Sequence, residues 1–173
     1  MKKIIGLVLF VAICSLSAQQ VNAQSLKFGH INRTELIQAM PEYDSANVEL
    51  QNFRDELINA LELLTVEFNN KNDAYTKEAQ NYTDIVRQTK EQELYDMNRR
   101  IQEFQEKASM DLQNKQAELF QPITVKADNA IQTVGKENGF VYIFDVSSGQ
   151  LAYFDESLSS NVLALVKTKL GIK

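Results

Sequence analysis

The sequence has very few residues that break helices. Its 173 residues include two prolines, Pro41 and Pro122, and six glycines, none of which lies between Gly29 and Gly135. The 80 positions from 42 to 121 therefore lack both residue types, and they are rich in Glu, Gln, Lys, Asn and Leu. Because glycine and proline are the least favourable residues in a helix interior, this composition predicts long helix and argues against a compact α/β domain for the segment.

Cysteine is scarce too, and the single copy, Cys14, lies in an N-terminal segment that is typical of an export signal. Lys2 and Lys3 precede an apolar stretch of ten residues from Ile4 to Ile13, and Ala23 ends the segment that follows. Ten residues are too few to cross a bilayer as a helix, which needs about 20. We therefore expect residues 1–23 to be a cleaved signal peptide, the protein to reach the periplasm, and no stable membrane anchor to remain.

The expected cleavage removes the cysteine and takes the net charge from −5 to −7, because Lys2 and Lys3 are lost with the signal. The mature chain then has no disulfide, thiol nucleophile or cysteine-based metal site. Its one histidine, His30, is interpreted as structural, since a lone histidine makes no conventional zinc site. We expect no metal, no cofactor and no enzymatic activity, and the acidic charge argues against nucleic acid as a partner.

Apolar residues of the long segment recur with a helical period. At about 100° per residue, eleven of those from Tyr43 to Tyr82 share an arc of about 80°, and eight of those from Val86 to Leu119 share a second arc of similar width at another phase. Such narrow arcs predict a packing seam within an arm. The main seam residues are Leu50, Phe53, Leu57, Leu61, Leu64, Phe68, Leu94, Met97, Ile101 and Phe104.

The change of phase is either a stutter in one helix or the tip of a hairpin. Two antiparallel helices that together span 42–121 must turn near their midpoint, where Asn81 to Asp84 supply turn and cap residues. The rival turn at Asn69 to Asp73 is off centre and interrupts a seam that resumes in phase. We therefore predict an antiparallel helical-hairpin arm with its tip near residues 80–84.

The segments on either side of the arm predict a small mixed body. Pro122 is expected to kink the helix or to restart it. The expected elements are a strand at 26–32, a short helix at 34–40, a helix after Pro122 that ends at Gly135 to Gly139, a strand at 140–146, a hairpin turn at 147–150, a returning strand at 151–154 and a helix at about 160–170. The predicted fold class is α+β, with a long coiled-coil arm on a small β-rich body of residues 24–41 and 122–173.

Charge divides between the same two parts. The arm segment holds 17 acidic and 9 basic residues, a net charge of −8, and the rest of the mature chain is near neutral. The arms are thus expected to be well solvated and to repel one another. Lys71 to Lys90, around the predicted tip, is the least acidic stretch, with four basic and three acidic residues.

This organisation resembles the Skp (OmpH-like) family of periplasmic chaperones over essentially the whole mature chain. The residues that carry the resemblance are Phe28-Gly29-His30-Ile31-Asn32, Glu35-Leu36-Ile37, Met40-Pro41-Glu42, Gly139-Phe140-Val141-Tyr142-Ile143-Phe144-Asp145, Leu151-Ala152-Tyr153-Phe154-Asp155 and Val162 to Leu170. The resemblance implies a homotrimer that assembles through the body and holds unfolded outer-membrane proteins, without ATP, in a cavity between three arms. Familiar members are basic, whereas this arm is acidic, so no lipopolysaccharide site is inferred.

Client contact, under this resemblance, is expected from apolar arm residues that leave the seam. These are Val48, Ile58, Leu63, Val66, Tyr95 and Met110. The same residues could instead be trimer contacts or isolated surface residues. The alternative function is that of a structural or adaptor coiled-coil protein of the cell envelope that binds one folded partner. A rod of that kind needs a continuous seam, and Asn72, Lys90 and Lys115 interrupt this one.

Overall fold

The computed structural model describes residues 26–172, so the predicted signal peptide at 1–23 lies outside the described residues. The elements, in chain order, are strand β1 (Lys27–Ile31), helices α2 (Arg33–Gln38) and α3 (Pro41–Glu78), the 3₁₀ turn η1 (Ala79–Asn81), helix α4 (Asp84–Glu137), strand β2 (Phe140–Asp145), the 3₁₀ turn η2 (Glu156–Leu158), strand β3 (Ser159–Asn161) and helix α5 (Leu163–Leu170).

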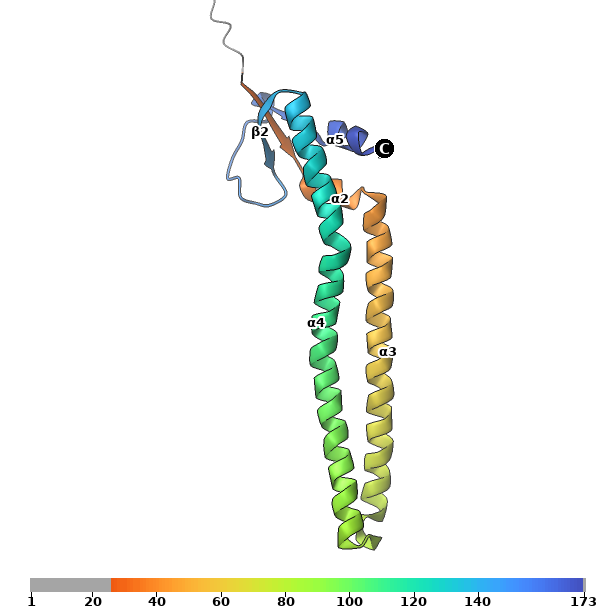
Figure 1. The fold of residues 1–173 in the computed structure, drawn as a ribbon. Coiled ribbons are helices and arrows are strands. Elements are labelled where there is room, and N and C mark those ends of the chain that lie inside the picture. The colour runs from red at the N-terminus through yellow and green to blue at the C-terminus, as the bar shows by residue number, and fades with distance from the viewer. Residues whose placement is uncertain (1–25, 173) are drawn as a thin grey trace, which may run out of the picture.

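The two long helices, α3 with 38 residues and α4 with 54, run antiparallel and form one extended arm (Figure 1). The predicted helical hairpin is confirmed. Pro41 is the first residue of α3, a position where its missing N–H costs nothing and its fixed φ suits the helix. At the other end, η1 and a short extended segment at Tyr82 and Thr83 reverse the chain before α4 begins at Asp84.

Pro122 neither ends nor restarts the helix, contrary to one of the two outcomes expected for it. It lies inside α4, which continues without a break from the tip to Glu137 (Figure 1). Proline inside a helix costs about 3 kcal/mol because it removes one hydrogen bond and crowds the preceding turn. The turns that follow bury four apolar residues in the core of the body, which holds the helix together: Ile123, Ala127, Ala130 and Val134.

The sheet has three strands in the order β2-β1-β3, and both neighbours of β1 are parallel to it. The predicted hairpin turn at 147–150 and returning strand at 151–154 are therefore wrong. Residues 151–154 form no strand, and the third strand is Ser159–Asn161, which pairs with β1 on the side away from β2. The last helix consequently begins at Leu163, later than expected.

The turn residues after β2 serve a different purpose from the one predicted. The Ser147 backbone N–H and hydroxyl both donate to Asp145 Oδ1, at 2.9 and 2.6 Å. These local hydrogen bonds to the Asp145 side chain stabilise the turn. The Val146 N–H still donates to the Ile31 carbonyl at 2.9 Å, which continues the pairing with β1. A Ser-Gly cluster thus marks a turn here without marking a hairpin.

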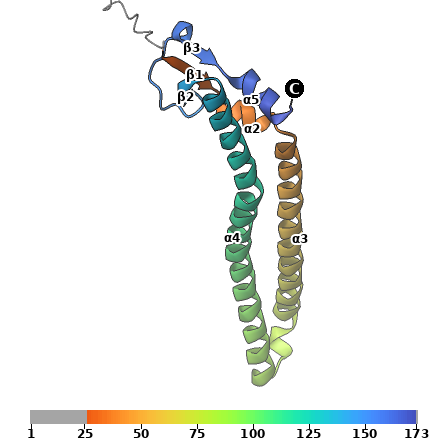
Figure 2. The same cartoon turned by 45° about the horizontal axis from the view of Figure 1, so that its top comes forward.

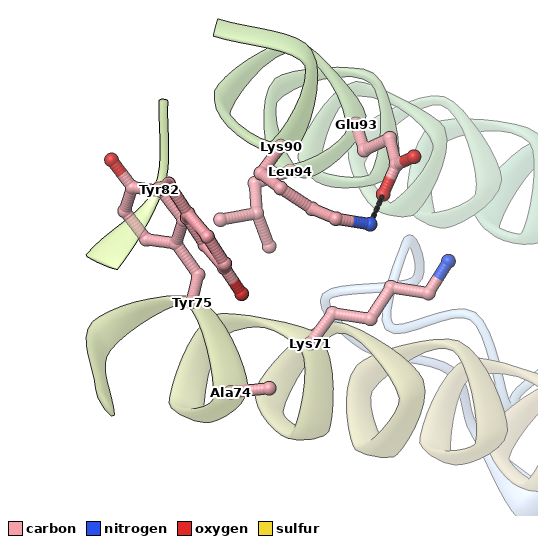
Figure 3. A pocket seen from close by; sticks show the side chains of 7 residues that line it. All are labelled: Lys71, Ala74, Tyr75, Tyr82, Lys90, Glu93 and Leu94. Atoms are coloured by element: carbon pink, nitrogen blue, oxygen red, sulfur yellow. Dashed lines mark hydrogen bonds and ion pairs between the residues drawn. The ribbon is translucent and has the colours of Figure 1, made fainter. Parts of the chain in front are cut away.

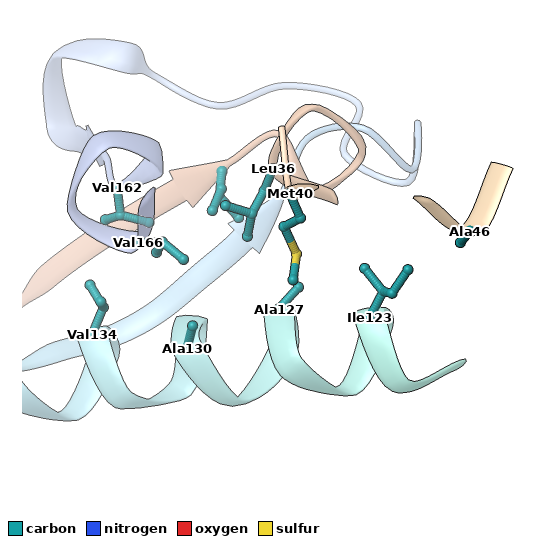
Figure 4. Packing of buried hydrophobic residues seen from close by; sticks show 10 residues of the cluster. Leu36, Met40, Ala46, Ile123, Ala127, Ala130, Val134, Val162 and Val166 are labelled. Atoms are coloured by element: carbon teal, nitrogen blue, oxygen red, sulfur yellow. The ribbon is translucent and has the colours of Figure 1, made fainter. Parts of the chain in front are cut away.

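The core of the described chain lies where α4 meets β1, α2 and α5, at the end of the molecule far from the tip (Figures 1 and 2). Figure 4 shows the packing of this core and labels nine of its residues. Its most deeply buried members are Ile31, Leu36, Met40, Ala127, Val134, Val162 and Val166. The body therefore includes the last turns of the long helix, and the arm is a direct extension of the core.

A bidentate ion pair connects the first residue of α2 to α4 beside the core. Arg33 donates from Nε and Nη2 to the two carboxylate oxygens of Asp128, at 2.7 and 2.9 Å. The Arg33 backbone N–H also points to Asp145 Oδ1 at 3.3 Å, which brings β2 into the same cluster. The hydrogen bond to Asp128 raises the pKa of Arg33, so the guanidinium stays charged at any physiological pH.

Candidate functional site: the arm and its tip

None of the ten predicted seam residues is exposed. Met97 and Ile101 are buried, and the other eight are half-buried. Two helices alone cannot enclose a seam completely, since each covers the other from one side only. The arm is therefore held by a long, thin apolar contact, and its stability is spread along its length.

Two ion pairs join α3 to α4 near the body. Lys126 pairs with Glu42, and Lys115 Nζ lies 2.7 Å from Glu49 Oε1. The hydrogen bond from Lys126 lowers the pKa of Glu42, and the hydrogen bond to Glu49 raises the pKa of Lys115. Lys115 was predicted to interrupt the seam. In the structure, its ammonium group forms an ion pair with Glu49 of α3 at this position.

The six residues proposed for client contact are all exposed in the single chain. Their exposed fractions range from 48% for Val66 to 72% for Leu63. Ile85 at the tip, also 72% exposed, belongs with them and was not singled out from the sequence. The signal that could have found it is its position two residues after the turn, opposite the seam of α4.

These exposed residues do not share one surface. At about 100° per residue, Val48, Leu63 and Val66 fall within about 60° of one another, roughly opposite the seam of α3. Tyr95 and Met110 are placed in the same way on α4. Because the two seams face each other, the two groups point in opposite directions and form two outer edges of the arm, which we call the α3 edge and the α4 edge.

A hollow of about 360 Å³ lies between the helices close to the tip. Figure 3 shows that Lys71 and Lys90 enter it from opposite helices and place their ammonium groups at the same end, with Tyr75 and Tyr82 at the other. The two tyrosine rings are 6.2 Å apart. Leu94 lies between the two ends (Figure 3). We call this hollow the tip pocket.

Hydrogen bonds to carboxylates occupy both tyrosine hydroxyls. Tyr75 donates to Glu91 at 2.5 Å and Tyr82 donates to Glu78 at 3.0 Å. The hydrogen bond to Glu91 raises the pKa of Tyr75, and desolvation together with Glu78 raises that of Tyr82. Both phenols therefore remain neutral, and their rings are held in place as walls of the pocket.

The sheet also presents an uncovered apolar face. Phe28 and His30 of β1 lie beside Tyr142 and Phe144 of β2 in the parallel register, and the Phe28 and Tyr142 rings stack 6.3 Å apart. A hollow of about 280 Å³ on this side is lined largely by apolar side chains, among them Phe154 and Leu158. The sequence predicted the strands, but the parallel register that gathers these rings could not be read from it.

His30 belongs to this face and has no neighbouring metal-ligand set. Its Nδ1 lies 2.9 Å from the Ser159 hydroxyl, and its ring lies 4.9 Å from that of Phe154. Within residues 26–172, no group of three or more His, Cys, Asp or Glu side chains is placed to hold a metal ion. In the same part of the chain, the long helices are too polar to be candidates for membrane spans.

Arm, body and uncovered face together define a helical-hairpin protein of the α+β class, in which one chain projects a single long arm from a small parallel sheet. The family model described as "Outer membrane protein (OmpH-like)" matches residues 27–170, and the chain belongs to this family. A comparison with curated proteins finds no significant match. At the level of the family, the protein is a periplasmic chaperone connected with outer-membrane proteins.

Proposed function

We propose that this protein is an ATP-independent holdase that binds unfolded outer-membrane proteins in a cavity between the arms of a homotrimer. The observation that carries the proposal is the arm itself, which exposes large apolar side chains along both outer edges while the compact core lies in the body. Strands of an outer-membrane barrel alternate apolar and polar residues and aggregate when unpaired. Many separate apolar contacts suit such clients better than one deep pocket.

The proposed client contacts are the residues of the two edges and their neighbour Ile58. They are Val48, Ile58, Leu63, Val66, Tyr95 and Met110. We propose that the α3 edge of one arm faces the α4 edge of the next arm across the gap between them. A client segment in such a gap contacts two subunits at once, which favours binding by the assembly over binding by one chain.

The uncovered face of the sheet supports assembly through the body. Tyr142, Phe144 and Leu158 are 59%, 39% and 73% exposed, which is unusual for side chains of this size in one small area. β2 is also an edge strand whose outer side has no partner among the described residues. We propose that three bodies, residues 24–41 and 122–173, cover these surfaces with one another, and that residues 42–121 form the client-binding arm.

The acidic arm is compatible with this function. A net charge of −8 on residues 42–121 keeps three neighbouring arms solvated and apart when the cavity is empty. Binding then depends on apolar contacts rather than on attraction between an acidic client and a basic arm. We accordingly expect client binding to change little with salt, apart from any contribution of the tip.

Native mass spectrometry of the mature protein, with and without a urea-unfolded outer-membrane protein, tests assembly and binding together. We expect a trimer alone and a complex of three chains with one client. Aggregation of the client, followed by light scattering without ATP, should be suppressed at stoichiometric ratios. A monomer, or no suppression at any ratio, contradicts the proposal. A pull-down that yields one folded stoichiometric partner and no unfolded client supports the adaptor function instead.

A further inference from the structure

Two lysines occupy seam positions near the tip. At about 100° per residue, Lys71 falls within the arc of the α3 seam and Lys90 falls at the centre of the α4 arc. Apolar side chains at these positions bring the helices together elsewhere in the arm. Here the helices are separated by the tip pocket, a hollow of about 360 Å³. Violations of a regular pattern of this kind concentrate at functional sites.

The lysines of the tip differ from Lys115, the other lysine of the seam. Lys115 meets Glu49 across the arm at 2.7 Å. Among the described residues, Lys71 and Lys90 pair only within their own helices, with Glu67 at 3.2 Å and with Glu93 at 3.0 Å. Pairs of this exposed, intrahelical type contribute little, because water solvates both partners well. Glu93 itself lines the hollow and holds Lys90, but no carboxylate among the described residues bridges the two ammonium groups.

The opposite end of the pocket is aromatic. Glu91 and Glu78 hold the hydroxyls of Tyr75 and Tyr82, so the rings themselves face the hollow (Figure 3).

We propose that the tip pocket binds a carboxylate of the unfolded client between Lys71 and Lys90, with an adjoining apolar or aromatic side chain against Tyr75 and Tyr82. This inference rests on the proposed holdase function and assigns its first polar contact. The carboxylate belongs either to an Asp or Glu side chain next to an apolar residue, or to the C-terminus of the client. Both sources present a carboxylate close to an apolar side chain.

The pocket has a specific consequence for an arm that is otherwise acidic. Acidic client segments are repelled along most of its length and find two lysines only at the tip. Binding exchanges two weak intrahelical pairs for one bridging carboxylate, so the contact is weak and reversible. The contact with the tip pocket orients the client at the entrance of the cavity between the arms. The apolar residues of the α3 edge and the α4 edge provide the remaining contacts.

Three ten-residue peptides, each with one central acid or amide next to Phe, test the pocket by fluorescence anisotropy on the mature protein. The first contains Asp-Phe and is amidated, the second contains Asn-Phe and is amidated, and the third contains Asn-Phe and ends in Phe with a free carboxylate. We expect the first, the third, or both to bind at least tenfold more tightly than the second. Tighter binding of the first peptide than of the second identifies an acidic side chain as the source of the carboxylate. Tighter binding of the third than of the second identifies the C-terminus.

The double variant Lys71→Gln/Lys90→Gln should weaken the acidic peptide at least tenfold. The matched control Lys77→Gln/Lys107→Gln removes the same charge from two exposed lysines outside the pocket and should change binding less than twofold. Circular dichroism of both variants should show wild-type helix content. A rise from 150 to 500 mM salt should weaken the acidic peptide severalfold and leave the neutral peptide unchanged.

Equal binding of the three peptides, or equal losses in both double variants, overturns the pocket assignment. Binding of anionic lipid vesicles that needs Lys71 and Lys90, without discrimination among the peptides, also overturns it and indicates a lipid headgroup. Failure of the holdase function is a separate result: the wild-type protein then fails to suppress client aggregation. Suppression by the wild type without peptide discrimination removes the pocket assignment alone.

Discussion

Lys115 of α4 and Glu49 of α3 form an ion pair that crosses the arm, with Nζ 2.7 Å from Oε1. The lysine side chain is only 22% exposed, whereas the glutamate is 57% exposed. The aliphatic stem of Lys115 therefore takes the place of a seam residue while its ammonium group reaches the edge of the arm. A sequence position that interrupts an apolar seam can thus still hold two helices together.

Replacement of Lys115 by alanine should loosen the arm near the body. Both the stem that fills the seam and the cross-arm hydrogen bond are lost, so hydrogen exchange should become severalfold faster around Glu49 and Lys115. Amides of the core, such as that of Val134, should be unaffected. Lys107→Ala is the matched control, because Lys107 is an exposed lysine of the same helix without an ion pair to any described residue. Equal effects of the two variants would contradict the role given to Lys115.

Gly29 should not tolerate a side chain. A Cβ at this position would lie 3.1 Å from Val162 Cγ1 and 3.2 Å from carbons of Ile143 and Phe140, which is closer than ordinary contact. Gly29→Ala is expected to lower the free energy of unfolding by about 1 to 3 kcal/mol, as overpacking usually does. Urea unfolding followed by circular dichroism measures the change.

Gly135 is the matched control for that variant and should tolerate a methyl group without loss of stability. It lies inside α4, and a Cβ there meets only Ile143 Cδ1 at 3.3 Å, the flexible end of a side chain. Gly135→Ala gains helix propensity of up to about 1 kcal/mol. We expect it to be neutral or stabilising. Destabilisation by both variants to the same extent would show that the body rejects any added methyl group, and that the contacts around Gly29 are not special.

Asp145 should make the body sensitive to acid. Burial raises the pKa of Asp145, but hydrogen bonds from Ser147 and Arg33 and the charge of Arg33 outweigh it and leave the pKa below the ordinary value of 3.8. A carboxyl group whose pKa is lower in the folded state stabilises the fold above its unfolded pKa and loses that contribution as the pH falls through the folded value. The wild-type free energy of unfolding should therefore fall below about pH 4.

The variant Asp145→Asn tests this contribution. The difference in the free energy of unfolding between wild type and variant should be largest above the ordinary pKa of a carboxyl group and should shrink as the pH falls through the lowered folded pKa of Asp145. Urea unfolding at several pH values gives the curve. Glu106→Gln, which removes an exposed carboxylate of the arm, should shift the curve little at any pH. A pH-independent difference for Asp145→Asn would mean that packing, and not charge, explains its effect.

The two edges of the arm should contribute separately to client binding. We expect Val48→Ser/Leu63→Ser/Val66→Ser and Tyr95→Ser/Met110→Ser each to raise the protein concentration needed for half-maximal suppression of aggregation by about threefold or more. Polar replacement of exposed residues costs the fold little, so trimer mass and melting temperature should be unchanged. Loss of activity from one edge alone would show that the client contacts only one side of each arm.

Much of the arm could be predicted because its signals are local. The absence of glycine and proline from 42 to 121, the seam of Leu57 and its neighbours, and the change of phase near Tyr82 are all visible within a few turns of helix. The course of the helix at Pro122 was harder to predict. A proline usually disrupts a helix, and the helix continues only where tertiary contacts hold the turns that follow. Ile123 and Val134 provide these contacts only once β1, α2 and α5 are assembled around them.

The body could be predicted only in outline because its contacts are distant in sequence. β1 pairs with strands more than a hundred residues away, and nothing in Ser147 to Gln150 distinguishes a hairpin from the turn that Asp145 makes. The tip pocket was hidden for a related reason. Lys90 interrupts its seam visibly, but that Lys71 enters the same hollow depends on how the two helices are aligned after the turn.

Because α4 continues without a break through Pro122, the arm projects as one rigid helix pair whose base is fixed in the core of the body. The stretch from Asp84 to Pro122 rises about 1.5 Å per residue, so nearly 60 Å of helix projects from a base that is clamped in the core. A rotation of about 10° at that base displaces the tip by roughly 10 Å. In the trimer that we propose, small changes in the packing of the body would be amplified into the width of the opening between neighbouring arms, so that clients of different size could enter without any change within the arm itself.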